Sequence, residues 1–297
     1  METIRTNSPK AWLLAARPKT LTGALVPVMI ALSLAWHDDR ESFQWLPALL
    51  CLLFACMMQI DANFVNDYFD YKRGIDREDR LGPERACSQG WITTAAMKRA
   101  LILVTCLSAL LGLPLIAWGG WNMIWIGIAC ILFCFLYTTF LSSRAMGDVL
   151  VLVFFGWVPV CATYYLQSGQ VTTDCFLLAT GCGLAIDNLL VVNNFRDRDT
   201  DRLHGKITLV TLLGEKPSLS LYLLLGIVAY VLLLITTSGG GYPSFILPSL
   251  YIAAVIGCWQ LMRRIRSGRA LNSVLGKTSL TILLYGIAAC INLLFLI

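Results

Sequence analysis

Two groups of carboxylate and amide side chains in this sequence are spaced so that each group shares one face of a helix. The first group is spaced i, i+4 and i+7 and consists of Asn63, Asp67 and Asp70. The second is spaced i, i+3 and i+7 and consists of Asn194, Asp197 and Asp201. Oxygen ligands of this kind suit Mg²⁺, which keeps further positions for water and for the phosphate oxygens of a substrate. Two such groups facing one another predict one or two Mg²⁺ ions bridged by a diphosphate.

The elements that carry these groups are apolar segments long enough to cross a membrane. Hydrophobic residues make up 57% of the chain and charged residues 14%, against about 25% charged residues in soluble proteins. Runs of about 18 or more apolar residues indicate membrane helices. The sequence therefore predicts an all-α, polytopic membrane protein in contact with membrane lipid. Its nine transmembrane helices are expected at about 17–36, 45–66, 99–118, 121–141, 148–167, 175–194, 219–237, 243–262 and 276–297.

Basic residues predict the orientation of these helices. Of the 23 Lys and Arg residues, all but Arg40 fall in the N-terminal segment and in every second connection after it. Because Lys and Arg collect on the cytoplasmic side of a membrane, the N-terminus is predicted to be cytoplasmic and the C-terminus external. The net charge of +5 follows from this topology and gives no reason to expect a nucleic acid partner. Nearly all of the eleven cysteines lie in apolar spans and are expected to pack there rather than bind metal.

The two acidic groups stand at matching places, each after the second of four predicted helices and with the same direction of crossing. This arrangement predicts two parallel four-helix repeats, at about 11–141 and 148–262, around a central cavity. An extra helix follows at about 276–297. The whole chain, 1–297, is expected to form one transmembrane domain.

Further charged residues are placed where they could serve the same site. Asp187 continues the line of the second group into the sixth span, where an aspartate costs about 2.5–3.5 kcal/mol and needs a partner or a wet cavity. Lys206 follows the second group, and Arg77 and Arg85 lie in the long connection after the first. These cations could neutralise the part of the phosphate charge that the metal does not neutralise.

A diphosphate at the membrane boundary suits a lipid substrate whose tail lies among the helices. Metal and cationic side chains would stabilise the departing diphosphate. An allylic carbocation would remain, which needs a water-poor site and is stabilised by aromatic faces. Candidate aromatic residues near the first group or at the end of the fourth span are Phe64, Tyr68, Phe69, Trp91 and Tyr137. An electron-rich aromatic acceptor would then attack the cation.

Two motifs connect these residues to a known family. The chain has N-D-x-x-D at 66–70 and D-x-x-x-D at 197–201, and through them it resembles the intramembrane aromatic prenyltransferase family over essentially its whole length. The resemblance implies that the catalytic, metal-holding residues are Asp67, Asp70, Asp197 and Asp201. It implies substrate-binding roles at the diphosphate or around the metal for Asn63, Asn66, Asn194, Arg77, Arg85 and Lys206. Further substrate contacts are expected from Lys19, at an acceptor carboxylate, and from Tyr137 and Asp187.

Within that family the chain resembles the branch that prenylates 1,4-dihydroxy-2-naphthoate. The match comprises RPKT at 17–20, NDYFDYKRGID at 66–76, GPER at 82–85, TYYLQ at 163–167 and GKIT at 205–208. It implies Mg²⁺-dependent transfer of a polyprenyl group from polyprenyl diphosphate, with loss of CO₂, to give demethylmenaquinol. The enzyme would lie in the inner membrane of a bacterium with its site facing the cytoplasm. One departure, Leu141-Ser142-Ser143 in place of an expected Gly-Pro, concerns the placement of the acceptor.

Three other readings remain open at this point. A sister enzyme would use 4-hydroxybenzoate, homogentisate, a tetrapyrrole or a lipid as acceptor. A transporter would also have buried carboxylates and duplicated halves, although the acidic residues here gather at one side of the membrane. A catalytically inactive relative acting as a scaffold is opposed by the completeness of both motifs.

Overall fold

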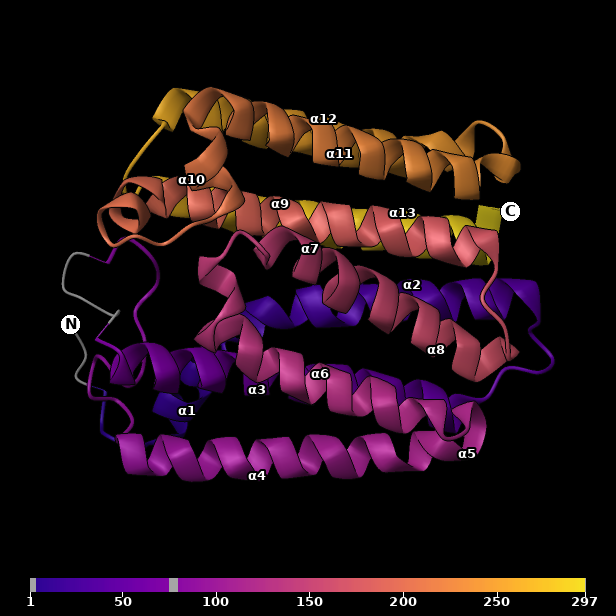
Figure 1. The fold of residues 1–297 in the computed structure, drawn as a ribbon. Coiled ribbons are helices and arrows are strands. Elements are labelled where there is room, and N and C mark those ends of the chain that lie inside the picture. The colour runs from indigo at the N-terminus through magenta and orange to yellow at the C-terminus, as the bar shows by residue number, and fades with distance from the viewer. Residues whose placement is uncertain (1–3, 75–79, 297) are drawn as a thin grey trace.

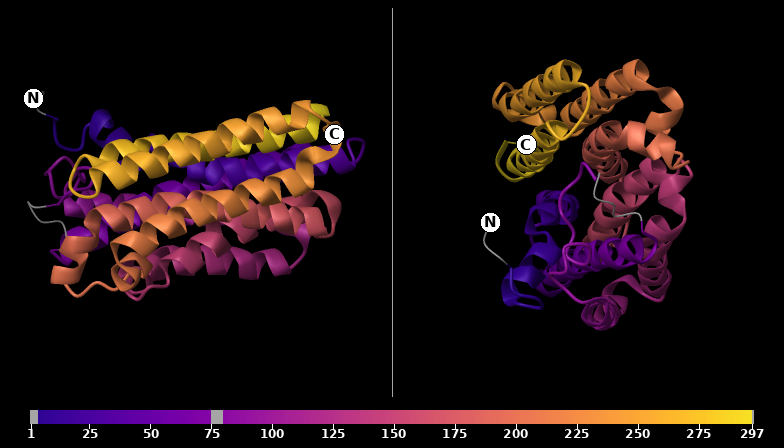
Figure 2. Two further views of the ribbon diagram at one scale, coloured as in Figure 1. Left: turned by 90° about the horizontal axis from the view of Figure 1, so that it is seen from above. Right: turned by 90° about the vertical axis from the view of Figure 1, so that its left-hand side faces the viewer.

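A computed structural model describes residues 4–74 and 80–296, and its long helices lie side by side along one axis (Figure 1). Within the described residues, nine helices are long and apolar enough to cross a membrane, and no strand is present. Seen along its axis, the molecule is a bundle of helices and not a set of flat layers (Figure 2). The prediction of an all-α membrane protein with nine transmembrane helices is confirmed.

The longest helices of the nine crossings are α2 (Leu21–Asp38), α3 (Trp45–Lys72), α4 (Thr94–Gly112), α6 (Asn122–Thr139), α8 (Val158–Ser168), α9 (Thr173–Leu203), α11 (Glu215–Thr237), α12 (Pro243–Ile265) and α13 (Leu271–Ile291). The shorter helices are α1 (Pro9–Ala16), α5 (Ile116–Gly119), α7 (Gly147–Val151) and α10 (Leu209–Leu213). A π-helical turn, Leu152–Trp157, joins α7 to α8, so that the two form one crossing at Gly147–Ser168.

Both acidic groups are helical, because α3 and α9 continue beyond the apolar spans that the sequence predicts. α3 ends at Lys72, just before Gly74, and α9 ends at Leu203, just before Gly205. Both glycines adopt a positive φ, 65° and 70°, which is the usual conformation of a residue that ends a helix. The carboxylates therefore lie on the last turns of two long helices, whose direction is set by the packing inside the membrane.

The first predicted helix, 17–36, corresponds to α2, and a short separate helix, α1, precedes it. Ser8 caps α1 by accepting a hydrogen bond from the backbone N–H of Ala11, and α1 ends before Arg17, which has a φ of 50°. A residue that precedes proline is disfavoured in a helix, and Pro18 follows directly. A 3-10 turn, Pro18–Thr20, then leads into α2. This break brings the chain back across the end of α3.

Packing in the bundle is centred on α9, which contacts α8, α11 and α13, while α2 contacts α3, α8 and α13. The larger core is built from α2, α8, α9, α11, α12 and α13. A second core joins α1, α3, α4 and the connection around Cys87. The division into two parallel repeats and the cytoplasmic N-terminus stay predictions.

Candidate active site

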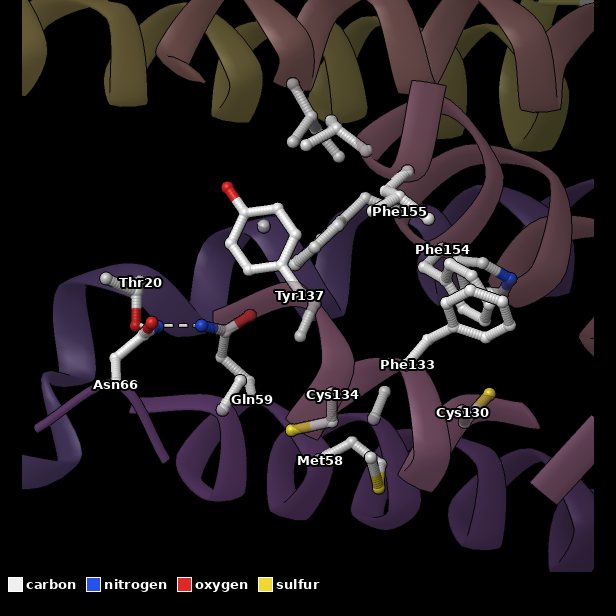
Figure 3. A pocket seen from close by; sticks show the side chains of 18 of the residues that line it. Thr20, Met58, Gln59, Asn66, Cys130, Phe133, Cys134, Tyr137, Phe154 and Phe155 are labelled. Atoms are coloured by element: carbon white, nitrogen blue, oxygen red, sulfur yellow. Dashed lines mark hydrogen bonds between the residues drawn. The ribbon is translucent and has the colours of Figure 1, made fainter. Parts of the chain in front are cut away.

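A cavity of about 1390 Å³ runs from the ends of α3 and α9 into the bundle. Its inner wall is mainly apolar and aromatic, with Phe133, Phe154 and Phe155 among the lining side chains (Figure 3). Its polar lining near the acidic helix ends includes Asn66, Asp70, Arg85, Asn194 and Lys206. The structure thus brings both acidic ends to one cavity, whose interior suits an apolar chain and whose mouth suits a charged group.

At the end of α3, the cavity is lined by Asn66 and Asp70. Nη1 of Arg85 donates to Oδ2 of Asp70 at 2.5 Å and to the carbonyl oxygen of Asn66 at 2.6 Å. The hydroxyl of Thr138 on α6 donates to the side-chain oxygen of Asn66 at 2.6 Å. Arg85 and Asp70 are mostly buried, with side-chain exposures of 8% and 14%. The connection after α3 therefore places a cation directly on the Asp70 carboxylate.

Asp67 and Asn63, also on α3, do not line the cavity. Asp67 is fully buried, and its two carboxylate oxygens accept backbone hydrogen bonds from Ala86 at 2.9 Å and Cys87 at 2.8 Å. The side-chain amide of Asn63 donates to the carbonyl of Ala16 and to the Thr20 hydroxyl, both at 2.9 Å. Asn63 thus holds the turn before α2 against α3, and Asp67 holds the connection after α3. These two segments line the cavity through Thr20 and Arg85, whereas Asn63 and Asp67 themselves do not.

At the end of α9, Asn194 lines the cavity and is 5% exposed. Asp197 lies one turn further on and accepts a bidentate ion pair from Arg196, at 2.8 and 2.5 Å. Asp201 lies a further turn on, and Nζ of Lys206, which lines the cavity, is 3.2 Å from its Oδ2. The loop that carries Lys206 is fixed by hydrogen bonds between Ile207 and the backbone of Ser143 and Ala145. The 141–143 segment therefore borders this loop.

The remaining predicted substrate contacts divide between the cavity wall and its surroundings. Lys19 is exposed and lines the cavity. Tyr137 lines it from α6, with its hydroxyl directed away from Gln59 and Asn66 of α3 (Figure 3). Asp187 is 4% exposed and lies on α9 beside the lining residue Ile186. Arg77, predicted to bind the diphosphate, lies outside the described residues.

Arg196 is a residue of the site that the sequence did not single out. It is 2% exposed, and beyond Asp197 its guanidinium donates to Asn193 and to Asn272 of α13, both at 2.8 Å. Asn272 in turn donates to the carbonyl of Leu81 at 2.8 Å. Arg196 thereby joins α9, α13 and the connection after α3. Its place inside the second motif was the available signal, but its charge was read only as a marker of topology.

The donor set at the ends of α3 and α9 fits a hard divalent cation, although Asp197 and Asp201 themselves do not line the cavity. Asp70, Asp197 and Asp201 offer carboxylate oxygens, and Asn66 and Asn194 offer amide oxygens, the kinds of ligand that Mg²⁺ takes in proteins. Each of the three carboxylates is paired with a basic side chain, so a cation can replace each pair and free a base for phosphate oxygens. No ready-made cluster of three His, Cys, Asp or Glu side chains is found among the described residues.

Comparison with known proteins agrees with this arrangement. Residues 24–293 match the UbiA prenyltransferase family. The chain is 40% identical over 217 residues to 1,4-dihydroxy-2-naphthoate octaprenyltransferase of Escherichia coli (strain K12), covering 69% of each chain. It is 33% identical over 294 residues to the enzyme of the same name from Mycobacterium tuberculosis (strain ATCC 25618 / H37Rv), covering 96% of this chain and 97% of that one.

Solved structures share the fold. The apo structure of a UbiA homolog from Aeropyrum pernix K1 superposes with a TM-score of 0.71 at 16% identity, covering 92% of this chain and 97% of that one. A UbiA homolog from Archaeoglobus fulgidus bound to GPP and Mg²⁺ gives a TM-score of 0.64 at 16% identity, with 94% and 99% covered.

A helical membrane bundle around an apolar cavity, with acidic and basic side chains at the helix ends beside it, is the architecture of a multi-pass membrane protein with one shared site. The chain belongs to the UbiA prenyltransferase family and is a membrane prenyltransferase. This replaces the transporter reading of the sequence.

Proposed function

We propose that the protein transfers a polyprenyl group from polyprenyl diphosphate to 1,4-dihydroxy-2-naphthoate, with loss of the acceptor carboxyl group as CO₂, to give demethylmenaquinol. The observation that carries the proposal is the meeting of the ends of α3 and α9 at the mouth of one apolar cavity of about 1390 Å³. The naphthoate is chosen as acceptor because relatives at 33–40% identity bear that activity in their names. We place the protein in the inner membrane of a bacterium, with this mouth facing the cytoplasm.

Five residues would hold Mg²⁺ in this proposal: Asn66, Asp70, Asn194, Asp197 and Asp201. When bound, the metal supplies charge neutralisation for the departing diphosphate. Asp67 has both oxygens engaged by backbone N–H groups, and we assign it to holding the connection that carries Arg85 rather than to the metal. The support for this division is that Asp70, Asp197 and Asp201 are each paired with a basic side chain, which an entering cation can displace, whereas the partners of Asp67 are backbone N–H groups.

Basic side chains at the mouth would bind the diphosphate. Arg85 and Lys206 line the cavity and are paired with Asp70 and Asp201, so a bound cation on those carboxylates lets the two bases donate to phosphate oxygens. The polyprenyl chain would lie along the apolar wall. Along this wall few polar groups would compete with the acceptor for the allylic cation. Aromatic faces such as those of Phe133 and Phe154 would stabilise the cation.

The test is product formation by the purified protein in detergent with labelled polyprenyl diphosphate, Mg²⁺ and a panel of acceptors. We expect a product from 1,4-dihydroxy-2-naphthoate whose mass shows addition of the prenyl group and loss of CO₂. Chelation of divalent cations should stop the reaction, and added Mg²⁺ should restore it. Consumption of 4-hydroxybenzoate or homogentisate with none of the naphthoate would overturn the acceptor assignment and leave the prenyltransferase class intact.

A further inference from the structure

Two aspartates on neighbouring crossings lie at the same depth in the membrane bundle. The π-helical turn after α7 packs closely on α9: a Cβ added at Gly183 would lie 3.2 Å from Cα of Leu152. Asp148 precedes Leu152 by four residues and Asp187 follows Gly183 by four, and the two crossings run in opposite directions. Four residues are about 6 Å of helix, so both aspartates lie about one turn from this close contact, toward the acidic helix ends.

Neither aspartate is fully satisfied by the protein. Oδ1 of Asp148 and Oδ1 of Asp187 are both buried and, within the described part of the chain, have no hydrogen-bond partner. Asp187 is 4% exposed. Buried polar atoms in native proteins are nearly always hydrogen-bonded, and a carboxyl group within a membrane span is costly unless it serves a site. Each of the two groups therefore has an oxygen that calls for a hydrogen-bond donor.

One of the two aspartates borders the cavity directly. Asp148 and Tyr137 line it, and Asp187 is buried next to the lining residue Ile186. Figure 3 shows Tyr137 among the lining side chains. A Cβ added at Gly147, the neighbour of Asp148, would lie 3.9 Å from the Tyr137 hydroxyl. Asp187 precedes Asn194 by seven residues, about 10 Å along α9, so the pair lies deeper in the bundle than the acidic helix ends.

We propose that Asp148 and Asp187 form the acceptor subsite, in which they bind the ring hydroxyl next to the carboxyl-bearing carbon of the aromatic acceptor and Asp148 takes its proton. This inference rests on the proposed function. The carboxylate of Asp148 accepts the hydroxyl proton, and the resulting phenolate pushes an electron pair through the ring to the carboxyl-bearing carbon. That carbon forms a bond to C1 of the allylic cation, whose bond to the diphosphate oxygen has broken with its electron pair.

The remaining steps restore the ring and the aspartate. The bond to the carboxylate breaks, CO₂ leaves, and its electron pair returns through the ring to the oxygen. Asp148 then gives the proton back to that oxygen. No proton is released overall, because the carboxylate carbon carries no hydrogen. Asp187 and the Tyr137 hydroxyl hold the acceptor in place but exchange no proton in this scheme.

The test combines Asp148→Asn and Asp187→Asn with two acceptors in which one ring hydroxyl is methylated, 1-methoxy-4-hydroxy-2-naphthoate and 4-methoxy-1-hydroxy-2-naphthoate. For a general base we expect Asp148→Asn to lower kcat/KM for the parent acceptor by about 10²–10⁴-fold, with KM for polyprenyl diphosphate unchanged. Methylation of the 1-hydroxyl, which adjoins the carboxyl-bearing carbon, should cost the wild type a similar factor. With that methylated acceptor, Asp148→Asn should lower kcat/KM by less than about threefold, because methylation has already removed the contact.

If the loss from Asp148→Asn and the loss from methylation multiply when combined, the proposal is overturned. An aspartate with a purely structural role would lower activity by the same factor whether or not the acceptor hydroxyl is methylated. A wild type that uses both methylated acceptors as well as the parent would also overturn it. Asp187→Asn should show the same non-additivity with a smaller loss. Asp174→Asn, on the exposed first turn of the same helix, is the matched control and should leave kinetics unchanged. If the wild type does not use the naphthoate, the proposed function is wrong. The combination of Asp148→Asn with methylation can then be repeated on the hydroxylated acceptor that the enzyme does use, and it still decides the role of Asp148.

Discussion

The guanidinium of Arg85 lies on the carboxylate of Asp70, with 2.5 Å between Nη1 and Oδ2. The two residues come from different segments, the last turns of α3 and the connection that follows it. The pair stands at the cavity mouth, and the equivalent carboxylates of α9 are also paired, with Arg196 and Lys206. The acidic and basic side chains at the mouth therefore balance one another. When a metal diphosphate enters, the carboxylates can pair with the metal and the basic side chains with the diphosphate.

Asp70→Asn tests whether the α3 carboxylate at the cavity serves the metal. We expect activity to fall by more than about 100-fold and the Mg²⁺ concentration for half-maximal rate to rise about tenfold or more, because a ligand charge is lost. Steady-state prenyl transfer measured over a Mg²⁺ titration gives both values. Asp199→Asn is the control: Asp199 lies inside the second motif, yet its side chain is 64% exposed. Near-normal Mg²⁺ dependence in Asp70→Asn would contradict the assignment.

Asp67→Asn separates an anchoring role from a metal role. An amide offers only one acceptor oxygen, so one of the backbone N–H groups of Ala86 and Cys87 would be left buried and unpaired, at a cost of about 1–3 kcal/mol. We expect a lower unfolding temperature in detergent and faster proteolysis of the connection near Cys87. The half-saturating Mg²⁺ concentration should stay within about twofold of the wild type. Unchanged stability together with a raised Mg²⁺ requirement would instead place Asp67 among the metal ligands.

Lys206→Gln tests the diphosphate contact. Loss of a charge-assisted hydrogen bond worth about 1.5–3 kcal/mol should raise KM for polyprenyl diphosphate by about 10–100-fold, with KM for the acceptor unchanged. Lys216→Gln removes the same charge from an exposed position in the first turn of α11 and should have no effect. Equal losses in the two variants would mean that only the general basic field matters.

Gly156→Ala tests the close packing that sets the depth of the cavity wall. An added Cβ would lie 2.6 Å from the carbonyl oxygen of Ala179 and 2.9 Å from Cα of Gly183, so the crossing must move away from α9. We expect a loss of about 1–3 kcal/mol in stability, measured as a lower unfolding temperature in detergent. Gly257→Ala on α12, where no heavy atom lies within 4 Å of the added Cβ, should be neutral or slightly stabilising.

Much of the fold could be predicted because membrane helices are specified by local composition. The nine spans follow from apolar length, and the glycines at 74 and 205 mark where α3 and α9 end. The start of the first span near Pro18 was predicted, but the short helix α1 before it was missed. In the site, the sequence identified both acidic ends and the basic residues Arg85 and Lys206, but it gave no role to Arg196 or Asp148.

The sequence by itself determined which turns carry carboxylates, because helical periodicity and apolar length are properties of neighbouring residues. It could not separate Asp67 from Asp70, which lie three residues apart and so point to nearly the same side of α3. Only the tertiary structure decided that Asp67 meets the backbone of Ala86 and Cys87 while Asp70 reaches the cavity. The same holds for Asp148 and Asp187, whose common depth depends on the packing of two crossings far apart in the chain. Such contacts have no local pattern, because they depend on which helices become neighbours in the folded bundle.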